Sequence, residues 1–196
     1  MIQPPHMPAP PLQAIVIGAS AGGVQALSAL LPNLSAKLGV PVMIVLHIPP
    51  DRPSQLADLF NARCEVPVRE ATDKEPAAPG TVFFAPPDYH LLVEPDRTLA
   101  LSVDEAVNYS RPSIDVLFES AAYAYGKGLL AIVLTGANGD GSQGVRVVKA
   151  KGGRVWVQDP ATAYMSAMPS ATLEAVTPDE ILSLDGMVQA LHTLNP

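Results

Sequence analysis

Three side chains in this sequence are of the types that together perform nucleophilic catalysis. Ser20 lies in the run GASAG at residues 18–22, which has the G-x-S-x-G spacing of a tight strand-to-helix turn that exposes a nucleophile. His47 lies in the segment LHIPP, and Asp140 lies in TGANGDG. A serine hydroxyl that attacks an acyl carbon needs a base to take its proton, and the base needs an acid to orient it. The three residue types therefore point to acyl transfer.

The turn around Ser20 is open to three interpretations. If Ser20 is a nucleophile, the free N–H groups at the start of the following helix, with Ala21 and Gly22, form an oxyanion hole. Alternatively Ser20 only caps that helix, or the glycine-rich turn binds phosphate. Dinucleotide binding is disfavoured because the spacing is not G-x-G-x-x-G, and because His47 rather than an acidic residue follows the second expected strand.

Four histidines compete for the role of general base. His47 fits best because it ends a strand expected to lie beside the strand that precedes Ser20. His6 lies in a proline-rich leader and His192 lies on the last expected helix, while His90 begins an expected edge strand and is the main rival. A structural polar role is the alternative for His47.

Asp140 is the best candidate for the acid of the site. It lies in a glycine-rich loop directly after an expected buried strand, where a rigid loop can hold an imidazole. Asp88 and Asp104 lie in the expected edge region, and Asp51 lies in a proline-rich turn. The alternative is that Asp140 is an ordinary turn aspartate.

The elements that must position these residues alternate between strands and helices. Short β-branched apolar runs predict buried strands, and apolar residues at helical spacing predict the helices between them. This alternation predicts an α/β fold with a doubly wound, mostly parallel sheet covered by helices on both faces. We expect strands at 14–17, 42–46, 129–134 and 154–158, and helices at 24–38, 54–62, 113–125, 142–151, 172–176 and 185–193.

Residues 66–102 have a different pattern. Four short apolar runs at 66–69, 81–85, 90–93 and 98–102 are joined by turns rich in Pro, Gly and Asp. We expect them to form a small antiparallel excursion at one edge of the sheet. In a parallel sheet ligands bind beyond the carboxyl ends of the strands, which is where Ser20, His47 and Asp140 are expected.

Composition limits the function classes. The chain has 196 residues, 48% of them hydrophobic, which is enough for one domain; we expect a flexible Pro-rich leader at 1–12 and the domain at 13–196. The single Cys64 excludes an internal disulfide and a cysteine-built metal site. A net charge of −7 argues against nucleic acid, and no apolar run is long enough to insert in a membrane. Cytoplasm is the expected location.

Six stretches in order carry a family resemblance: IGASAGG (17–23), LHIPP (46–50), PGTVFFAPPDYHLLV (79–93), NYSRPSIDVLF (108–118), LTGANGDGSQG (134–144) and MPSA (168–171). Over about residues 13–194 the chain resembles the catalytic domain of the chemotaxis protein-glutamate methylesterases, the CheB family. The resemblance implies a serine hydrolase that removes methyl esters from glutamates of methyl-accepting chemotaxis receptors and that in some members deamidates glutamines.

Carried over by motif, the resemblance makes Ser20 the nucleophile, His47 the base and Asp140 the acid. It implies no metal and no organic cofactor. The loop that carries Asp140 is expected to add a backbone N–H, that of Ala137, to the oxyanion hole. Arg111, in the SRPSID segment, is expected to bind a substrate carboxylate or else to hold local structure.

The chain departs from the family pattern in three places. The family usually carries a receiver domain ahead of this unit, so we expect either an excised domain or a stand-alone member controlled by a separate regulatory protein. The acid loop usually reads G-M-G-x-D-G, whereas Ala137 and Asn138 stand here in place of Met and Gly. The residue after the serine is often Thr and is Ala21 here. The alternative function is therefore a non-catalytic or divergent signalling module of the same fold.

Overall fold

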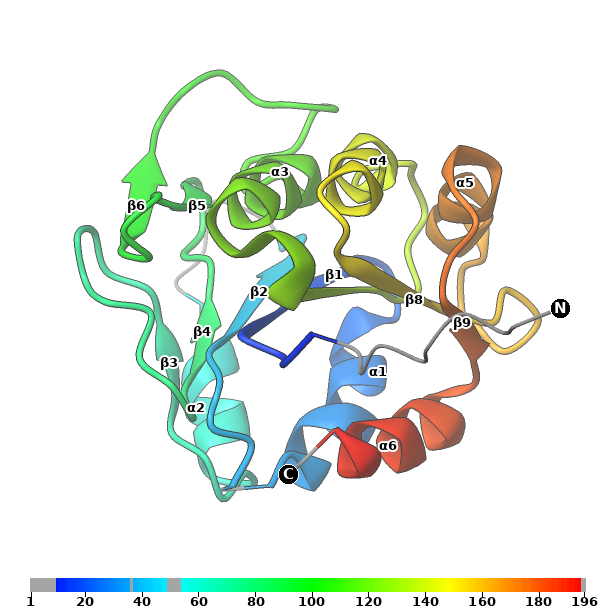
Figure 1. The fold of residues 1–196 in the computed structure, drawn as a ribbon, viewed down its shortest axis with the longest axis horizontal. Helices are drawn as coiled ribbons and strands as arrows, with labels where there is room; N and C mark the ends of the chain where they lie inside the picture. The colour runs from blue at the N-terminus through cyan, green and yellow to red at the C-terminus, as the bar shows by residue number, and fades with distance from the viewer. Residues whose placement is uncertain (1–9, 36, 49–53, 195–196) are drawn as a thin grey trace, which may run out of the picture.

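A seven-stranded sheet runs through the middle of the molecule with helices on both of its faces (Figure 1). The computed structural model describes residues 10–35, 37–48 and 54–194. The strand order is β3-β4-β2-β1-β7-β8-β9, and every neighbouring pair is parallel. The strands are β1 (Ala14–Ala19), β2 (Val42–Leu46), β3 (Val68–Glu70), β4 (Val82–Phe84), β7 (Leu129–Val133), β8 (Arg154–Gln158) and β9 (Glu180–Leu182).

In the described part of the chain, six α-helices form the two outer layers. Figure 1 shows α3, α4 and α5 on one face of the sheet, with α1, α2 and α6 on the other. This arrangement and the parallel sheet confirm the predicted fold class. The helices are α1 (Gly23–Leu30), α2 (Leu56–Asn61), α3 (Ile114–Tyr125), α4 (Ser142–Ala150), α5 (Ala167–Ala175) and α6 (Leu184–Thr193).

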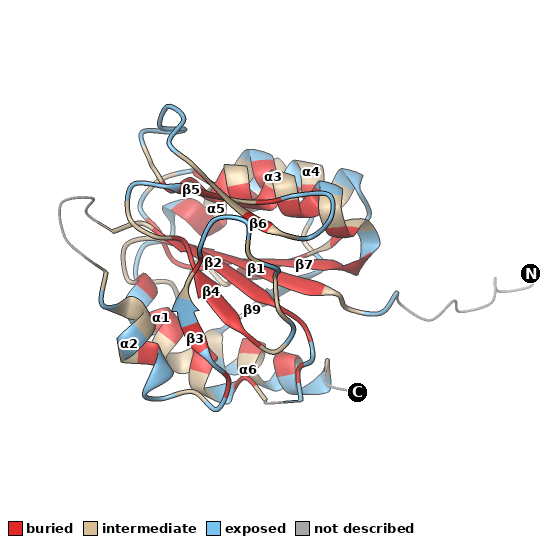
Figure 2. Ribbon diagram, turned by 90° about the vertical axis from the view of Figure 1, so that its left-hand side faces the viewer, coloured by how far each residue is buried: buried red, intermediate tan, exposed pale blue. Residues whose placement is uncertain are grey.

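The central strands are apolar on both faces because both faces are covered. All residues of β1, β2 and β7 are buried, as the red strands of Figure 2 show. Alternate side chains of β1 enter two separate cores: Val16 belongs to the core that contains Phe118 of α3, and Ile17 belongs to the core that contains Leu27 of α1. Continuous β-branched runs are the sequence pattern of such doubly covered parallel strands.

Strand β1 lies where the chain reverses its direction across the sheet. From β1 the chain forms β2 beside it, then the outer strand β3, and then β4 between β2 and β3; later it places β7, β8 and β9 on the other side of β1. The carboxyl edge at such a switch point is the usual ligand crevice of an open α/β sheet. The loops that follow β1, β2 and β7 all emerge there.

The predicted antiparallel excursion is smaller than expected and separate from the main sheet. Among the strands of the described residues, β5 (His90–Val93) and β6 (Leu99–Ser102) alone pair antiparallel, in a two-stranded sheet that packs against α3. Strands β3 and β4 instead extend the main sheet in parallel, which corrects their predicted place. The physical reason is that Val82–Phe84 is fully buried, as a covered parallel strand must be.

Some element boundaries also differ from the predictions. The helix expected at 24–38 ends at Leu30 and continues as a 3₁₀ turn, Leu31–Asn33, which contains Pro32 in its first turn. Strand β9 was missed, because Glu180–Leu182 is largely exposed at the sheet edge and too short to show a pattern. Most of the predicted leader, together with His6 and Asp51, lies outside the described residues.

Candidate active site

The strand register places Ser20, His47 and Thr135 side by side at the carboxyl edge of the sheet. Ala19 pairs with Leu46 across β1 and β2, and the N–H of His47 donates to the Ala19 carbonyl at 3.1 Å. On the other side of β1, the N–H of Ser20 donates to the Thr135 carbonyl at 3.0 Å. The sheet itself therefore brings the loops of the serine and the histidine together.

The serine turn is tight and depends on glycine. Gly22 is the N-cap of α1 and adopts a left-handed conformation with φ of 81°, and a Cβ added at Gly22 would lie 2.6 Å from Cβ of Tyr164. The buried Thr135 hydroxyl donates to the Ala21 carbonyl at 2.8 Å and accepts the Met165 N–H at 2.8 Å. Thr135 therefore ties the serine turn to the segment that carries Met165.

The three backbone donors that the sequence predicts for an oxyanion hole have no acceptor within the described part of the chain. The N–H groups of Ala21, Gly22 and Ala137 make no hydrogen bond there to a backbone or side-chain oxygen. Ala21 and Gly22 precede the first residue of α1, whose positive dipole end adds to their field. These are the donors expected of an oxyanion hole.

His47 is joined to Asp140 and not to Ser20. Its Nε2 lies 2.9 Å from Oδ2 of Asp140, whose side chain is fully buried, while the imidazole is 14% exposed. The other ring nitrogen, Nδ1, lies 3.5 Å from the Asn138 side-chain amide. Among the described residues no hydrogen bond links the Ser20 hydroxyl to His47. The pair His47–Asp140 is thus assembled, and Nδ1 is the nitrogen left for a base.

Asp140 is a buried carboxylate surrounded by donors. Burial acts to raise the pKa of Asp140, but hydrogen bonds from His47, Ile114 and Asn108 outweigh burial and hold this pKa below its usual value of 3.8. Asp140 is therefore ionised at neutral pH. Its Oδ2 accepts from His47 and from the Ile114 N–H at 2.6 Å, and its Oδ1 accepts from Ser113 Oγ at 2.9 Å, Gly141 N–H at 3.0 Å, Asn108 Nδ2 at 3.1 Å and Asp115 N–H at 3.2 Å.

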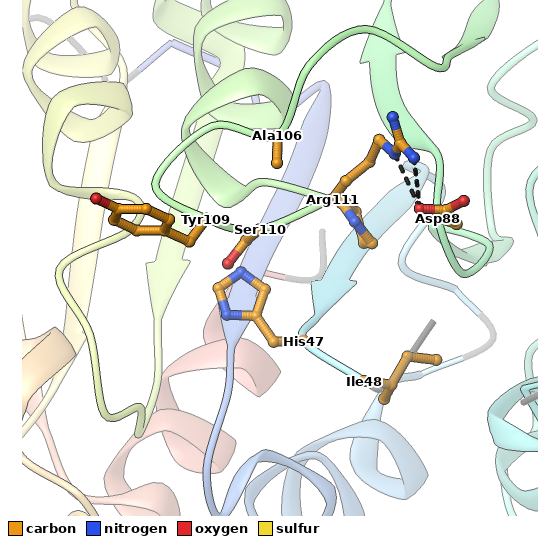
Figure 3. Close-up of a pocket in the computed structure, with 8 residues that line it drawn as sticks. His47, Ile48, Asp88, Ala106, Tyr109, Ser110 and Arg111 are labelled. Atoms are coloured by element: carbon orange, nitrogen blue, oxygen red, sulfur yellow. Dashed lines mark hydrogen bonds and ion pairs between the residues drawn. The ribbon is translucent and has the colours of Figure 1, made fainter. Parts of the chain in front are cut away.

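A pocket of about 300 Å³ opens beside His47 (Figure 3). The imidazole points toward the segment that carries Tyr109 and Ser110, and Tyr109 is fully exposed at this rim. The pocket is large enough for a single side chain and is open to solvent.

Arg111 lines this pocket but directs its guanidinium away from His47 (Figure 3). Nε and one terminal nitrogen donate to Asp88 at 3.0 and 2.7 Å, and the other terminal nitrogen donates to the carbonyls of Val103 and Asp104 at 2.9 and 3.0 Å. These contacts favour the loop-holding role over the substrate-binding role that the sequence left open.

The rival residues have other partners. His90 is buried, with Nδ1 accepting the Ser113 N–H at 3.1 Å and Nε2 3.1 Å from the Glu105 carbonyl. Both of its nitrogens are therefore occupied by the backbone. Asp88 pairs with Arg111, and Asp104 accepts from Ser102.

Comparison with known proteins identifies the family. The family model described as CheB methylesterase matches residues 15–191. The chain belongs to the CheB methylesterase family. A Leptospira interrogans protein provisionally named protein-glutamate methylesterase/protein-glutamine glutaminase is 45% identical over 183 residues, covering 93% of this chain and 95% of that protein. The prediction that the chain is an esterase of this family is confirmed.

Two further CheB relatives extend the comparison. A Nocardioides protein named protein-glutamate methylesterase/protein-glutamine glutaminase is 44% identical over 91% of this chain, and the chain spans 50% of its length. The crystal structure of the Thermotoga maritima CheB methylesterase catalytic domain superposes with a TM-score of 0.89 at 32% identity, covering 93% of this chain and 98% of that one. The crystal structure agrees with the fold described above.

Sequence reasoning missed the residues that support this CheB site. Thr135, Asn108, Ser113 and Asn138 all contact the serine turn, Asp140 or His47. All four lie inside motifs that carried the resemblance, but neither spacing nor residue type showed which polar atoms would meet.

Metal and membrane features were also sought in the described residues. In residues 10–35, 37–48 and 54–194, no three His, Cys, Asp or Glu side chains are grouped to hold a metal ion. Within the same ranges, none of the helices has the length and apolar character needed to cross a membrane.

Proposed function

We propose that this chain removes methyl groups from methyl-esterified glutamate side chains of chemotaxis receptors through a Ser20–His47–Asp140 triad in the cytoplasm. The observation that carries the proposal is the His47–Asp140 hydrogen bond of 2.9 Å at the strand edge where Ser20 emerges on the neighbouring strand. The names of the relatives supply the substrate class, methyl esters of protein glutamates.

The reaction begins with attack of the Ser20 oxygen on the ester carbonyl carbon. His47 takes the serine proton through Nδ1, because Nε2 is committed to Asp140. The bond between Ser20 and Nδ1 forms in the substrate complex, as catalytic hydrogen bonds often tighten only there. Asp140 fixes the tautomer with hydrogen on Nε2 and stabilises the imidazolium that results.

The negative charge that develops on the carbonyl oxygen needs donors that are already in place. The N–H groups of Ala21, Gly22 and Ala137 fill this role in the proposal, because they have no other acceptor among the described residues. The intermediate then collapses, His47 returns the proton to the methoxide, and methanol leaves.

Hydrolysis of the acyl-enzyme repeats the same proton transfers with water. His47 takes a proton from the water, the hydroxide attacks the acyl carbon, and the proton returns to the Ser20 oxygen as glutamate is released. A glutamine side chain enters the same cycle with ammonia as the leaving group, consistent with the second activity in the names of the relatives.

The substrate assignment is tested by measuring methanol from two sources. Methylated receptor membranes and a small glutamate methyl ester are each incubated with the full chain. Release from receptor membranes at a much higher kcat/KM than from the small ester supports the proposal. Turnover of the small ester with none from the membranes contradicts the receptor substrate.

A further inference from the structure

Asp140 has a buried neighbour, Asp115, that the proposed reaction does not use. Asp140 lies just before α4 and accepts the N–H groups of Ile114 and Asp115 at the start of α3. In return, Oδ1 of Asp115, in the first turn of α3, accepts the Gly144 N–H of α4 at 2.7 Å. Each carboxylate thus caps the other helix, which brings two negative charges close together.

The side-chain amide of Asn108 joins these two carboxylates. Its Nδ2 donates one hydrogen to Oδ2 of Asp115 at 2.8 Å and the other to Oδ1 of Asp140 at 3.1 Å. Because carboxylates only accept, the NH₂ group must face them, which settles the orientation of the amide. Burial, and then the charge of Asp140, raise the pKa of Asp115, as expected of a like-charge pair.

The backbone around Asn108 is held in an uncommon conformation. Asn108 and Tyr109 have φ of 50° and 61°, and the two hydrogen bonds between Val107 and Ser110 close the turn. Asn tolerates the left-handed region better than other non-glycine residues. Asn108 as a whole is exposed, yet its amide reaches the carboxylates of two buried residues, Asp115 (4% exposed) and Asp140 (1% exposed). Closing the turn does not require a side chain that contacts these buried carboxylates, so the contacts indicate a further role for Asn108.

We propose that Asn108 is a positioning residue that orients Asp140 toward His47. Its donation fixes Oδ1 of Asp140 so that Oδ2 keeps facing the imidazole, and its NH₂ group separates the two carboxylates. Only the expected loss of kcat in Asn108 variants rests on the proposed function. The geometry of the His47–Asp140 pair is a property of the free protein.

Two variants remove the donor in different ways. Asn108→Gly deletes the amide while accepting the positive φ, and Asn108→Asp keeps the shape while replacing the donor by a third acceptor. Asn61→Gly is the matched control, because Asn61 is also an exposed asparagine whose amide oxygen accepts one backbone N–H, that of Val68 at 3.0 Å. It lies at the end of α2 and contacts the first residue of β3, at the amino edge of the sheet and not at the carboxyl edge where Ser20 and His47 lie.

The first readout is kinetic. In methanol release from methylated receptor membranes, both Asn108 variants are expected to lower kcat by about tenfold or more, the loss typical of a hydrogen bond to a charged group, with KM changed less than about twofold. Asn61→Gly is expected to keep kcat. A wild-type kcat in folded Asn108→Gly and Asn108→Asp overturns the proposal, as does an effect on KM alone.

The second readout needs no substrate. The Nε2–H resonance of ¹⁵N-labelled His47, which reports the hydrogen bond to Asp140, is expected to move in both Asn108 variants and to stay in place in Asn61→Gly. An unmoved resonance in the Asn108 variants overturns the positioning role. Failure of the wild type to release methanol overturns the proposed function instead, and the resonance still decides the role of Asn108.

Discussion

Replacing Asp140 by Asn is the most informative single change in this site, because it exchanges one oxygen for an NH₂ group and so turns the acceptor that faces His47 into a donor. The lowest-cost placement of the new NH₂ group is at the Oδ2 position, since Oδ1 accepts from four donors and Oδ2 from two. The NH₂ group then donates to Nε2 of His47. The imidazole proton moves to Nδ1, which can no longer take the proton of Ser20.

The size of both effects follows from these contacts. The wrong tautomer is expected to lower kcat by about 10⁴-fold, the loss seen when the acid of a serine protease triad becomes an amide. The buried Ile114 N–H, which now donates to Oδ2 at 2.6 Å, loses its acceptor. An unsatisfied buried donor costs about 1–3 kcal/mol of stability. Domains of this kind are stable by about 5–15 kcal/mol, so the variant is expected to fold.

The assay combines methanol release with denaturant unfolding. Asp179→Asn is the matched control: Asp179 also accepts a backbone N–H, that of Val155 at 2.7 Å, and it pairs with Lys149 in the last turn of α4, at the opposite end of this helix from the site loop. It is expected to lose stability and keep kcat. A folded Asp140→Asn enzyme with kcat within tenfold of the wild type would refute the assignment of Asp140 as the acid.

Three further predictions concern the surroundings of the site. Because the pKa of Asp140 is lowered in the folded state, the contribution of this carboxylate to stability is full above about pH 4–5 and is lost as pH falls through 3.8 toward the folded value. The free energy of unfolding, measured by urea titration at a series of pH values, should therefore fall less steeply with decreasing pH in Asp140→Asn than in the wild type; an equal fall would contradict the lowered pKa. Thr135→Val should lower stability by about 1–3 kcal/mol and also lower kcat, because the Ala21 carbonyl loses its buried donor. An unchanged kcat would contradict the claim that Thr135 positions the serine turn for catalysis. Arg111→Ala and Asp88→Ala should raise KM by similar factors, because each removes the same ion pair that holds the loop, and the double variant should raise KM no further. A rise in KM for Arg111→Ala but not for Asp88→Ala would instead show that Arg111 binds the substrate directly.

The sequence predicts the fold and the triad candidates because both depend on local patterns. Short β-branched apolar runs such as Val42–Leu46 favour covered strands, and the residue after each such strand lies at the carboxyl edge of a parallel sheet. Ser20, His47 and Asp140 follow from that rule together with their chemistry. The place of β3 and β4 did not follow, because a three-residue strand carries too few side chains to show which partner it pairs with.

The supporting residues were beyond reach of the sequence for a different reason. The contacts of Asn108 with Asp115 and Asp140 depend on a turn with two positive φ values and on the packing of α3 against α4. Long-range placement of that kind leaves no periodic signal. Likewise, nothing in the SRPSID motif indicated that the guanidinium of Arg111 would be occupied by Asp88 and two carbonyls.

The central claim is that Ser20 is a nucleophile acting on methylated receptors, and one comparison tests it most directly. Methanol release from methylated chemoreceptor membranes is measured with the wild-type chain and with Ser20→Ala, both shown to be folded. The proposed mechanism predicts release by the wild type and loss of release in the variant. Equal release from both would contradict the nucleophile, and no release from either would contradict the esterase activity on receptors.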